Sequence, residues 1–235
     1  MPKTFSIEES LKFGWQKTKA NSMILFQIML TLFAVQVVSS IVSKVLENTL
    51  IGFFAALAVG ILGIFLQYGF VVIVLKLARG EATTYRDIIP KPALVWKLFL
   101  AGLLVGVLTL AGLILLIIPG IYFALRFSMT SFAIIDGAGI MESFEKSTKL
   151  TDGHKWQLLG LFVVFALINI VGFLLFIVGL LVTVPVTMIG IAHVYQSLKS
   201  QSHEAPAAIH EHTHDHNHEG HEHHDHDHSD PNHTH

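Results

Sequence analysis

Residues 96–120 read "WKLFLAGLLVGVLTLAGLILLIIPG", and no charged side chain interrupts the 21 residues between Lys97 and Pro119. A helix of about 20 apolar residues crosses the roughly 30 Å hydrocarbon core of a bilayer, so this stretch predicts a membrane-spanning helix. The whole chain has the same character, since 52% of its 235 residues are hydrophobic and 14% are charged. In soluble domains about a quarter of the residues are charged. The sequence therefore predicts an all-α integral membrane protein.

Further apolar runs set the expected number of spans. Long runs cover residues 23–42, 50–75, 98–118 and 158–178. Two shorter runs, 121–137 and 180–198, follow breaks at Pro119-Gly120 and at Gly179. Each of them reaches spanning length only with its weakly polar flank, so a re-entrant or interfacial segment is the alternative for both. The prediction is a six-span helical bundle over residues 1–199, followed by a tail over residues 200–235. No small-residue cleavage pattern follows the first run, which predicts an anchor and not a removable signal peptide.

The distribution of Lys and Arg predicts the orientation of the spans. Of the 15 basic residues, 13 fall before the first span, after the last one, or in the loops on that same side. The opposite side has Lys44, and Arg126 lies inside the fourth run. Because cytoplasmic loops are enriched in Lys and Arg, both termini and the tail are expected in the cytoplasm.

Internal similarities indicate that the bundle is built from repeated units. Placing Trp96 over Trp156 aligns residues 96–120 with "WQLLGLFVVFALINIVGFLLFIVGL" at 156–180. A second offset places Glu9 and Ser10 over Glu142 and Ser143, ahead of the first and fifth spans. The expected unit is a short helix followed by a two-helix membrane hairpin, used three times.

Short amphipathic helices are expected at residues 6–19 and 139–151. The first starts with a capping box, Ser6-x-x-Glu9, and has an apolar face that predicts a helix in the headgroup plane, formed by Ile7, Leu11 and Trp15. The second has two ion pairs at helical spacing, Glu142 with Lys146 and Glu145 with Lys149. We interpret both as helices that position the hairpins; a lipid-sensing or partner-binding role is the alternative.

Three stretches carry a resemblance to a known family: "SLKFGWQKTKANSMIL" at 10–25, "IIPGIYFALRFSM" at 117–129 and "ESFEKSTKLTDGHKWQLLGL" at 142–161. They resemble the uncharacterised bacterial integral membrane proteins of the YciC type. They are also similar to the membrane domain that accompanies some glycerophosphodiester phosphodiesterases. The resemblance covers about residues 5–199 and implies a six-span bundle in the bacterial cytoplasmic (inner) membrane. The phosphodiesterase chemistry belongs to a separate soluble domain, and the histidine-rich tail is not part of the family pattern.

Polar groups at membrane depth are candidate functional sites, because burying them in lipid is costly. Those expected within the spans are Gln27, Gln36, Gln67, Arg126, Asn169 and His193. We interpret the amides as interhelical hydrogen-bonding groups and expect Arg126 to extend to the outer interface. No span has Asp or Glu in its central part, which argues against transport like that of cation diffusion facilitators or ZIP proteins. Catalytic and cofactor-binding motifs are also missing, so no enzymatic activity is expected.

The tail carries the metal-ligand chemistry of the sequence. It holds eight acidic residues and no Lys or Arg, so its formal charge is −8, whereas residues 1–199 carry +6. The expected metal ligands are His203, His210, His212, His214, His216, His218, His221, His223, His224, His226, His228, His233 and His235. Imidazole with carboxylate suits zinc, nickel, cobalt or cupric copper, and about four ligands per ion give roughly three ions. A chain this polar is expected to be disordered without metal. Alternatives are a purification tag, which the interspersed acids disfavour, and a solvated tail that docks on the basic face by charge alone.

The leading prediction is a non-enzymatic, multi-pass membrane protein whose cytoplasmic tail buffers, senses or delivers transition metal. Its expected partners are membrane lipids and a metal-handling or membrane protein, and no nucleic acid. One alternative is a transporter or lipid-handling bundle with a regulatory tail, in which Gln, Asn and Arg126 would line the path. Another is a scaffold that organises other membrane proteins.

Overall fold

The computed structural model describes residues 5–46, 49–175 and 178–204, and all regular structure in these ranges is helical. Six segments are long and apolar enough to cross a membrane: Ser22–Val45, Leu50–Arg79, Pro92–Leu115, Ile117–Ile135, Lys155–Leu174 and Leu180–Ser202. The chain is therefore a six-span, multi-pass helical membrane protein, as the apolar runs predicted.

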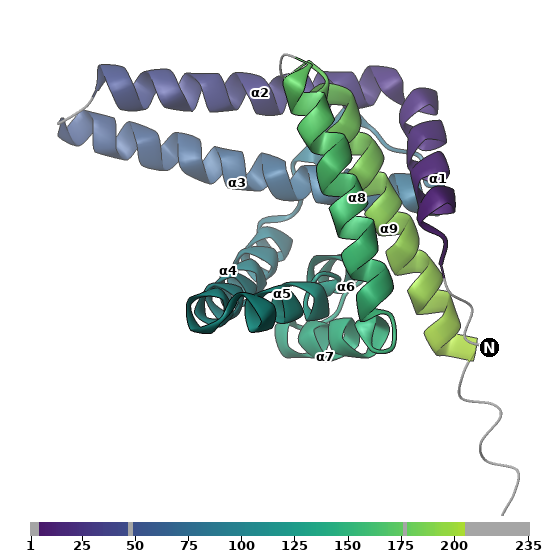
Figure 1. The fold of residues 1–235 in the computed structure, drawn as a ribbon. Helices are drawn as coiled ribbons and strands as arrows, with labels where there is room; N and C mark the ends of the chain where they lie inside the picture. Colours follow the sequence, from purple (N-terminus) through teal and green to yellow (C-terminus); the bar gives the residue numbers. More distant parts are fainter. Residues whose placement is uncertain (1–4, 47–48, 176–177, 205–235) are drawn as a thin grey trace, which may run out of the picture.

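The six spans form three antiparallel hairpins. The first joins α2 (Ser22–Val45) to α3 (Leu50–Arg79), and the last joins α8 (Lys155–Leu174) to α9 (Leu180–Glu204). The middle hairpin joins α4 (Pro92–Leu115) to α5 (Ile117–Arg126), and the chain continues into α6 (Thr130–Ile135). In Figure 1 the α2–α3 hairpin runs to the left, α8 and α9 run from top to bottom, and α4 to α7 lie below α3. The hairpins thus diverge from a shared junction.

Each hairpin follows a short element, which fits the predicted threefold unit. Helix α1 (Ile7–Ala20) precedes the first hairpin and α7 (Ile140–Thr151) precedes the third. The middle hairpin follows a single 3-10 turn, η1 (Tyr85–Ile88). Both ion pairs predicted on α7 are formed, at 2.7 Å each, and the Ser6 hydroxyl caps α1 by accepting from the Glu9 amide.

Burial is concentrated at the junction and fades toward the tips of the hairpins. Leu75, Leu98 and Leu158 are fully buried, whereas Leu50 and Leu115 at the tips are about four-fifths exposed. Exposed leucines are expected on helices that face lipid. The three hairpins are therefore held together at one end, and their tips are available to the membrane.

The buried ends of α3, α6 and α9 meet around Asp136, which contacts Arg79 and Lys199. We call this region the basic end, because Lys76 also lies here. The charge pattern predicted that Lys76, Arg79 and Lys199 share one face; Asp136 brings Arg79 and Lys199 together, and Lys76, three residues before Arg79 on α3, pairs with Asp87. Exposed tryptophans also lie near the start of each hairpin, as expected for side chains at a membrane interface: Trp15, Trp96 and Trp156.

Two span boundaries differ from the sequence prediction. The break between the third and fourth spans lies at Leu116, and Pro119 and Gly120 belong to the first turn of α5. Proline is tolerated there, because the first amides of a helix have no intrahelical partner. Helix α9 continues beyond the predicted end of the sixth span near residue 198, to Glu204. The predicted boundary at residue 199 therefore lies inside a helix.

Helix α1 does not stand apart from the spans as a helix in the headgroup plane would; it packs lengthwise and antiparallel along α9. Its closest contacts with α9 come from the row of small buried residues Ser10, Gly14 and Thr18; Ile7 and Leu11 of the predicted apolar face are half-buried against the core, and Trp15 is exposed. Gly14 lies against the Val186 carbonyl and Ser10 lies near Gly190. Small residues allow two helix backbones to approach closely, which decides how this pair packs.

Gly14→Ala is expected to destabilise the protein by about 1–3 kcal/mol, because the new methyl group would overlap the Val186 carbonyl oxygen. Gly60→Ala is the matched control, since an added Cβ there meets no atom within 4 Å. Alanine favours a helix by about 1 kcal/mol over glycine, so the control should be neutral or stabilising. Thermal unfolding in detergent, followed by circular dichroism, measures both. Equal midpoints for the two variants would contradict the packing of α1 on α9.

Candidate functional site

The predicted metal ligands lie almost entirely beyond the described residues. His203 belongs to the last turn of α9, but its side chain is outside the description. The other twelve predicted ligands lie entirely outside the described residues: His210, His212, His214, His216, His218, His221, His223, His224, His226, His228, His233 and His235. The metal-binding prediction therefore rests on the sequence, and the described structure ends inside the tail, at Glu204 of α9.

The two histidines of the membrane domain have other contacts. The His193 ring stacks on Phe13 of α1 with ring centroids 4.1 Å apart. The His154 ring nitrogen lies 3.1 Å from the Asp152 carbonyl oxygen. Within the described ranges, no three His, Asp or Glu side chains come together as a metal site.

Asp136 is the most connected acidic side chain of the basic end. Its carboxylate is 7% exposed and contacts Arg79 of α3 and Lys199 of α9. The Tyr195 hydroxyl of α9 donates to the same carboxylate at 2.8 Å. Two cations and a hydroxyl compensate one buried carboxylate, so the cluster ties the end of α6 to both α3 and α9.

A second acidic contact fixes the connection between the first and second hairpins. The Lys76 ammonium donates to Asp87 of η1 at 2.9 Å, and the Thr84 amide donates to the other carboxylate oxygen at 2.9 Å. The Lys76 hydrogen bond, helped by the Thr84 amide, lowers the pKa of the Asp87 carboxyl. This contribution to stability is present above the ordinary aspartate pKa and is lost as the pH falls through the lowered value.

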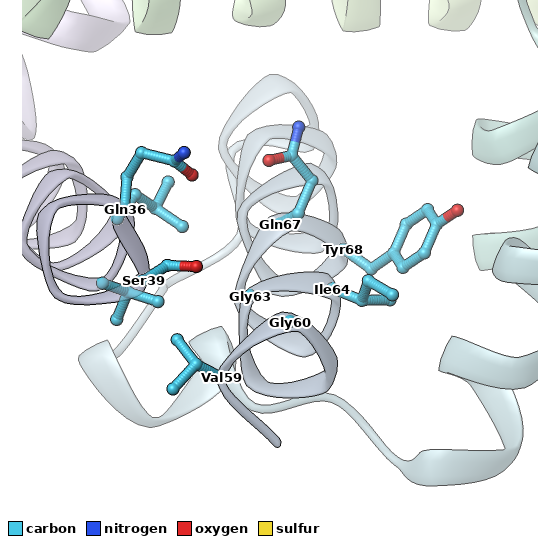
Figure 2. A pocket seen from close by; sticks show the side chains of 10 residues that line it. Gln36, Ser39, Val59, Gly60, Gly63, Ile64, Gln67 and Tyr68 are labelled. Atoms are coloured by element: carbon cyan, nitrogen blue, oxygen red, sulfur yellow. The ribbon is translucent and has the colours of Figure 1, made fainter. Parts of the chain in front are cut away.

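A cleft of about 370 Å³ with both apolar and polar walls lies between α2 and α3. Figure 2 shows Gln36 and Ser39 pointing from α2 toward α3, where Gln67 reaches the same space and Gly60 and Gly63 leave room. In the described structure neither glutamine side chain hydrogen-bonds to the other helix, so the predicted interhelical amide bonds are not formed here. The cleft instead presents three polar side chains at the level of the spans.

Other polar groups of the spans lie elsewhere. The Asn169 amide of α8 donates to Thr187 of α9 at 3.1 Å, which confirms the predicted interhelical role for this residue. Arg126 contacts α7, and Gln36 and Gln67 line the α2–α3 cleft. The described structure places these groups in three different hairpins and does not bring them together at one site, and the transport alternative stays a prediction.

The sequence predicts that Arg126 extends to the outer interface; in the structure its side chain contacts α7. It lies where the fourth span breaks, between α5 and α6, and its guanidinium donates to the Thr148 hydroxyl of α7 at 3.2 Å. The buried hydroxyls of Ser147 and Thr151 donate to the Arg126 carbonyl, and Ser147 also accepts from the Met129 amide. Helix α7 thus supplies the partners that an interrupted membrane helix needs. The Arg126 side chain reaches α7 because α5 ends at Arg126, and the apolar sequence of the fourth run has no pattern that predicts this helix end.

A cavity of about 430 Å³ lies where the three hairpins meet; we call it the junction cavity. Its walls are apolar apart from two serine hydroxyls and come from α3, α5, α6, α8 and α9: Val71, Ile121, Ala124, Leu125, Ser128, Ser131, Phe132, Leu159, Phe162, Met188 and Ile191. Pockets for small ligands have a similar size, about 300–1,000 Å³. The sequence gives no signal for this cavity, because most of its lining residues are apolar side chains spread over five helices that no motif connects.

No protein-family model, curated protein or solved structure matches the chain. The resemblance to the YciC-type proteins and to the phosphodiesterase membrane domain therefore stays a prediction.

Asp136→Asn is expected to lower stability by about 2–4 kcal/mol, because Arg79 and Lys199 would lose their common counter-charge in a partly buried site. Glu145→Gln is the control: it breaks an exposed ion pair with Lys149 and should cost less than about 0.5 kcal/mol. Thermal unfolding of both variants in the same detergent gives the comparison. A midpoint for Asp136→Asn that matches the control would show that this cluster does not hold the basic end together.

Proposed function

We propose that this protein is a membrane-anchored binder of transition metal, in which the tail, residues 200–235, holds zinc, nickel, cobalt or cupric ions at the membrane surface. The observation that carries the proposal is the tail's 13 histidines and eight acidic residues, without a single Lys or Arg. Imidazole and carboxylate are the ligands these ions prefer when thiolates are missing, and the chain has no cysteine. The protein acts by binding and not by catalysis.

The arrangement of the membrane domain supports a surface role for the tail. Helix α9 is continuous to Glu204 and is tied to the basic end through Lys199 and Asp136, so the tail starts close to that end. The excess of Lys and Arg there favours a cytoplasmic position for both termini in the bacterial inner membrane. Ions bound by the tail would be held within reach of this face, where they can be buffered, sensed or transferred to a metal-handling partner.

The full chain in detergent is expected to bind about three Zn²⁺ ions at pH 7.5, at about four ligands per ion. A chain that ends after Glu204 should bind none above background, because the described residues contain no metal cluster. Isothermal titration calorimetry with zinc measures the stoichiometry. Equal binding by both chains would place the metal in the membrane domain and overturn the proposal.

Replacing the twelve histidines from His210 to His235 by glutamine separates metal binding from simple electrostatics. This variant keeps all eight acidic residues of the tail, so charge-driven docking on the basic end should persist while zinc binding is lost. Unchanged zinc binding would assign it to the carboxylates. For the unaltered chain, affinity should fall as the pH drops through about 6.5, because only neutral imidazole is a ligand.

A further inference from the structure

Two cations, Arg126 and Lys155, contact Tyr122 beside the junction cavity. The Arg126 guanidinium donates to the Tyr122 hydroxyl at 3.2 Å, and the Lys155 ammonium donates to it at 3.4 Å. Both cations also lie over the Tyr122 ring, at 5.9 and 4.9 Å from its centroid. Two positive groups from α5 and α8 therefore converge on a single hydroxyl, in a position where one anion can contact both.

The negative charge around this pair is small. No carboxylate of the described chain lies within 4.0 Å of the Arg126 guanidinium, and the hydrogen bonds to Thr148 and Tyr122 engage two of its five N–H groups. Lys155 pairs with Asp152 at 3.0 Å, but the Asp152 side chain is 73% exposed, so that pair is weak. Arginine beside hydroxyl groups is well suited to bind phosphate through two parallel hydrogen bonds.

The cation pair and the junction cavity are parts of the same two helices. Leu159 lies one helical turn after Lys155 on α8, and Ile121 and Leu125 flank Tyr122 and Arg126 on α5; all three line the cavity. Ile121 and Ala124 are exposed, so the cavity opens sideways between α5 and α8. Trp156, 85% exposed, follows Lys155 in the chain and is the type of side chain found at headgroup depth.

We propose that Tyr122, Arg126 and Lys155 bind the phosphate of an anionic glycerophospholipid, and that one of its acyl chains enters the junction cavity. The cations and hydroxyls match the headgroup, and the apolar walls match the chain. The lateral opening allows a lipid to enter from the bilayer. This site is separate from the metal-binding tail and does not depend on it.

The test is native mass spectrometry of the full chain in detergent with phosphatidylglycerol or phosphatidylcholine of the same acyl chains. The wild-type protein is expected to retain phosphatidylglycerol about tenfold better. Arg126→Gln and Lys155→Gln should each reduce that preference severalfold, and the double variant should abolish it. Lys149→Gln is the matched control, because this exposed lysine lies on the neighbouring α7 outside the site, and it should leave the preference unchanged.

A second variant tests the acyl chain. Ala124→Phe fills the opening of the cavity from an exposed position and should reduce retention of both lipids several-fold without changing the helical content. Circular dichroism and gel filtration verify folding; if Arg126→Gln does not fold, Lys155→Gln and Ala124→Phe still decide the outcome.

Three results would overturn the proposal. Equal loss of preference in Lys149→Gln and Lys155→Gln would mean diffuse attraction to a basic surface. Unchanged retention in Ala124→Phe would exclude the cavity as the acyl site. Displacement of phosphatidylglycerol by millimolar inorganic phosphate, with phosphate itself retained, would identify a phosphate site that needs no lipid.

Discussion

The buried carboxylate of Asp136 is the constraint on which the arrangement of the hairpins depends. Helices in lipid gain little from burying apolar side chains against each other, because the lipid tails are equally apolar. Close packing and polar contacts must therefore hold them together. Asp136 ends α6 and engages Arg79 of α3 and Lys199 of α9, so one side chain joins all three hairpins at the same end. The buried carboxylate is compensated in place, and the two cations around it are only partly buried.

The same constraint explains why packing is uneven along the spans. Where α1 lies on α9, Gly14 and Gly190 bring the backbones into contact, and the core residues Leu75 and Leu158 are fully buried. Toward the tips there is neither an ion cluster nor a close glycine contact between the first and third hairpins in the described structure, and the leucines there are exposed. A molecule held at one end and divergent at the other leaves openings between its hairpins. The junction cavity lies between the three hairpins near their shared end, whereas the α2–α3 cleft lies within the first hairpin.

Much of this fold follows from the sequence, and the exceptions have physical reasons. Spans are predictable because about 20 apolar residues have one stable arrangement in a bilayer. The helix break at residues 127–129 is not predictable from the local sequence. The Arg126 carbonyl before it accepts hydrogen bonds from Ser147 and Thr151, which belong to a helix distant in the sequence. The packing face of α1 was also missed, since Ser10, Gly14 and Thr18 look neutral beside an apolar row that includes Trp15. Both errors arise where tertiary contacts override a local pattern.

The tail and the membrane domain carry opposite formal charges. The tail carries −8 and residues 1–199 carry +6, so without metal the acidic side chains are attracted to the same basic surface that would attract anionic headgroups. Three divalent ions on neutral imidazoles would offset six of the eight negative charges of the tail. Metal binding would then weaken the attraction of the tail to the basic end, and Arg126 and Lys155 would be free to bind other anions. The tail follows Lys199 of α9 directly, and this makes the competition local, because the tail begins beside the Asp136 cluster.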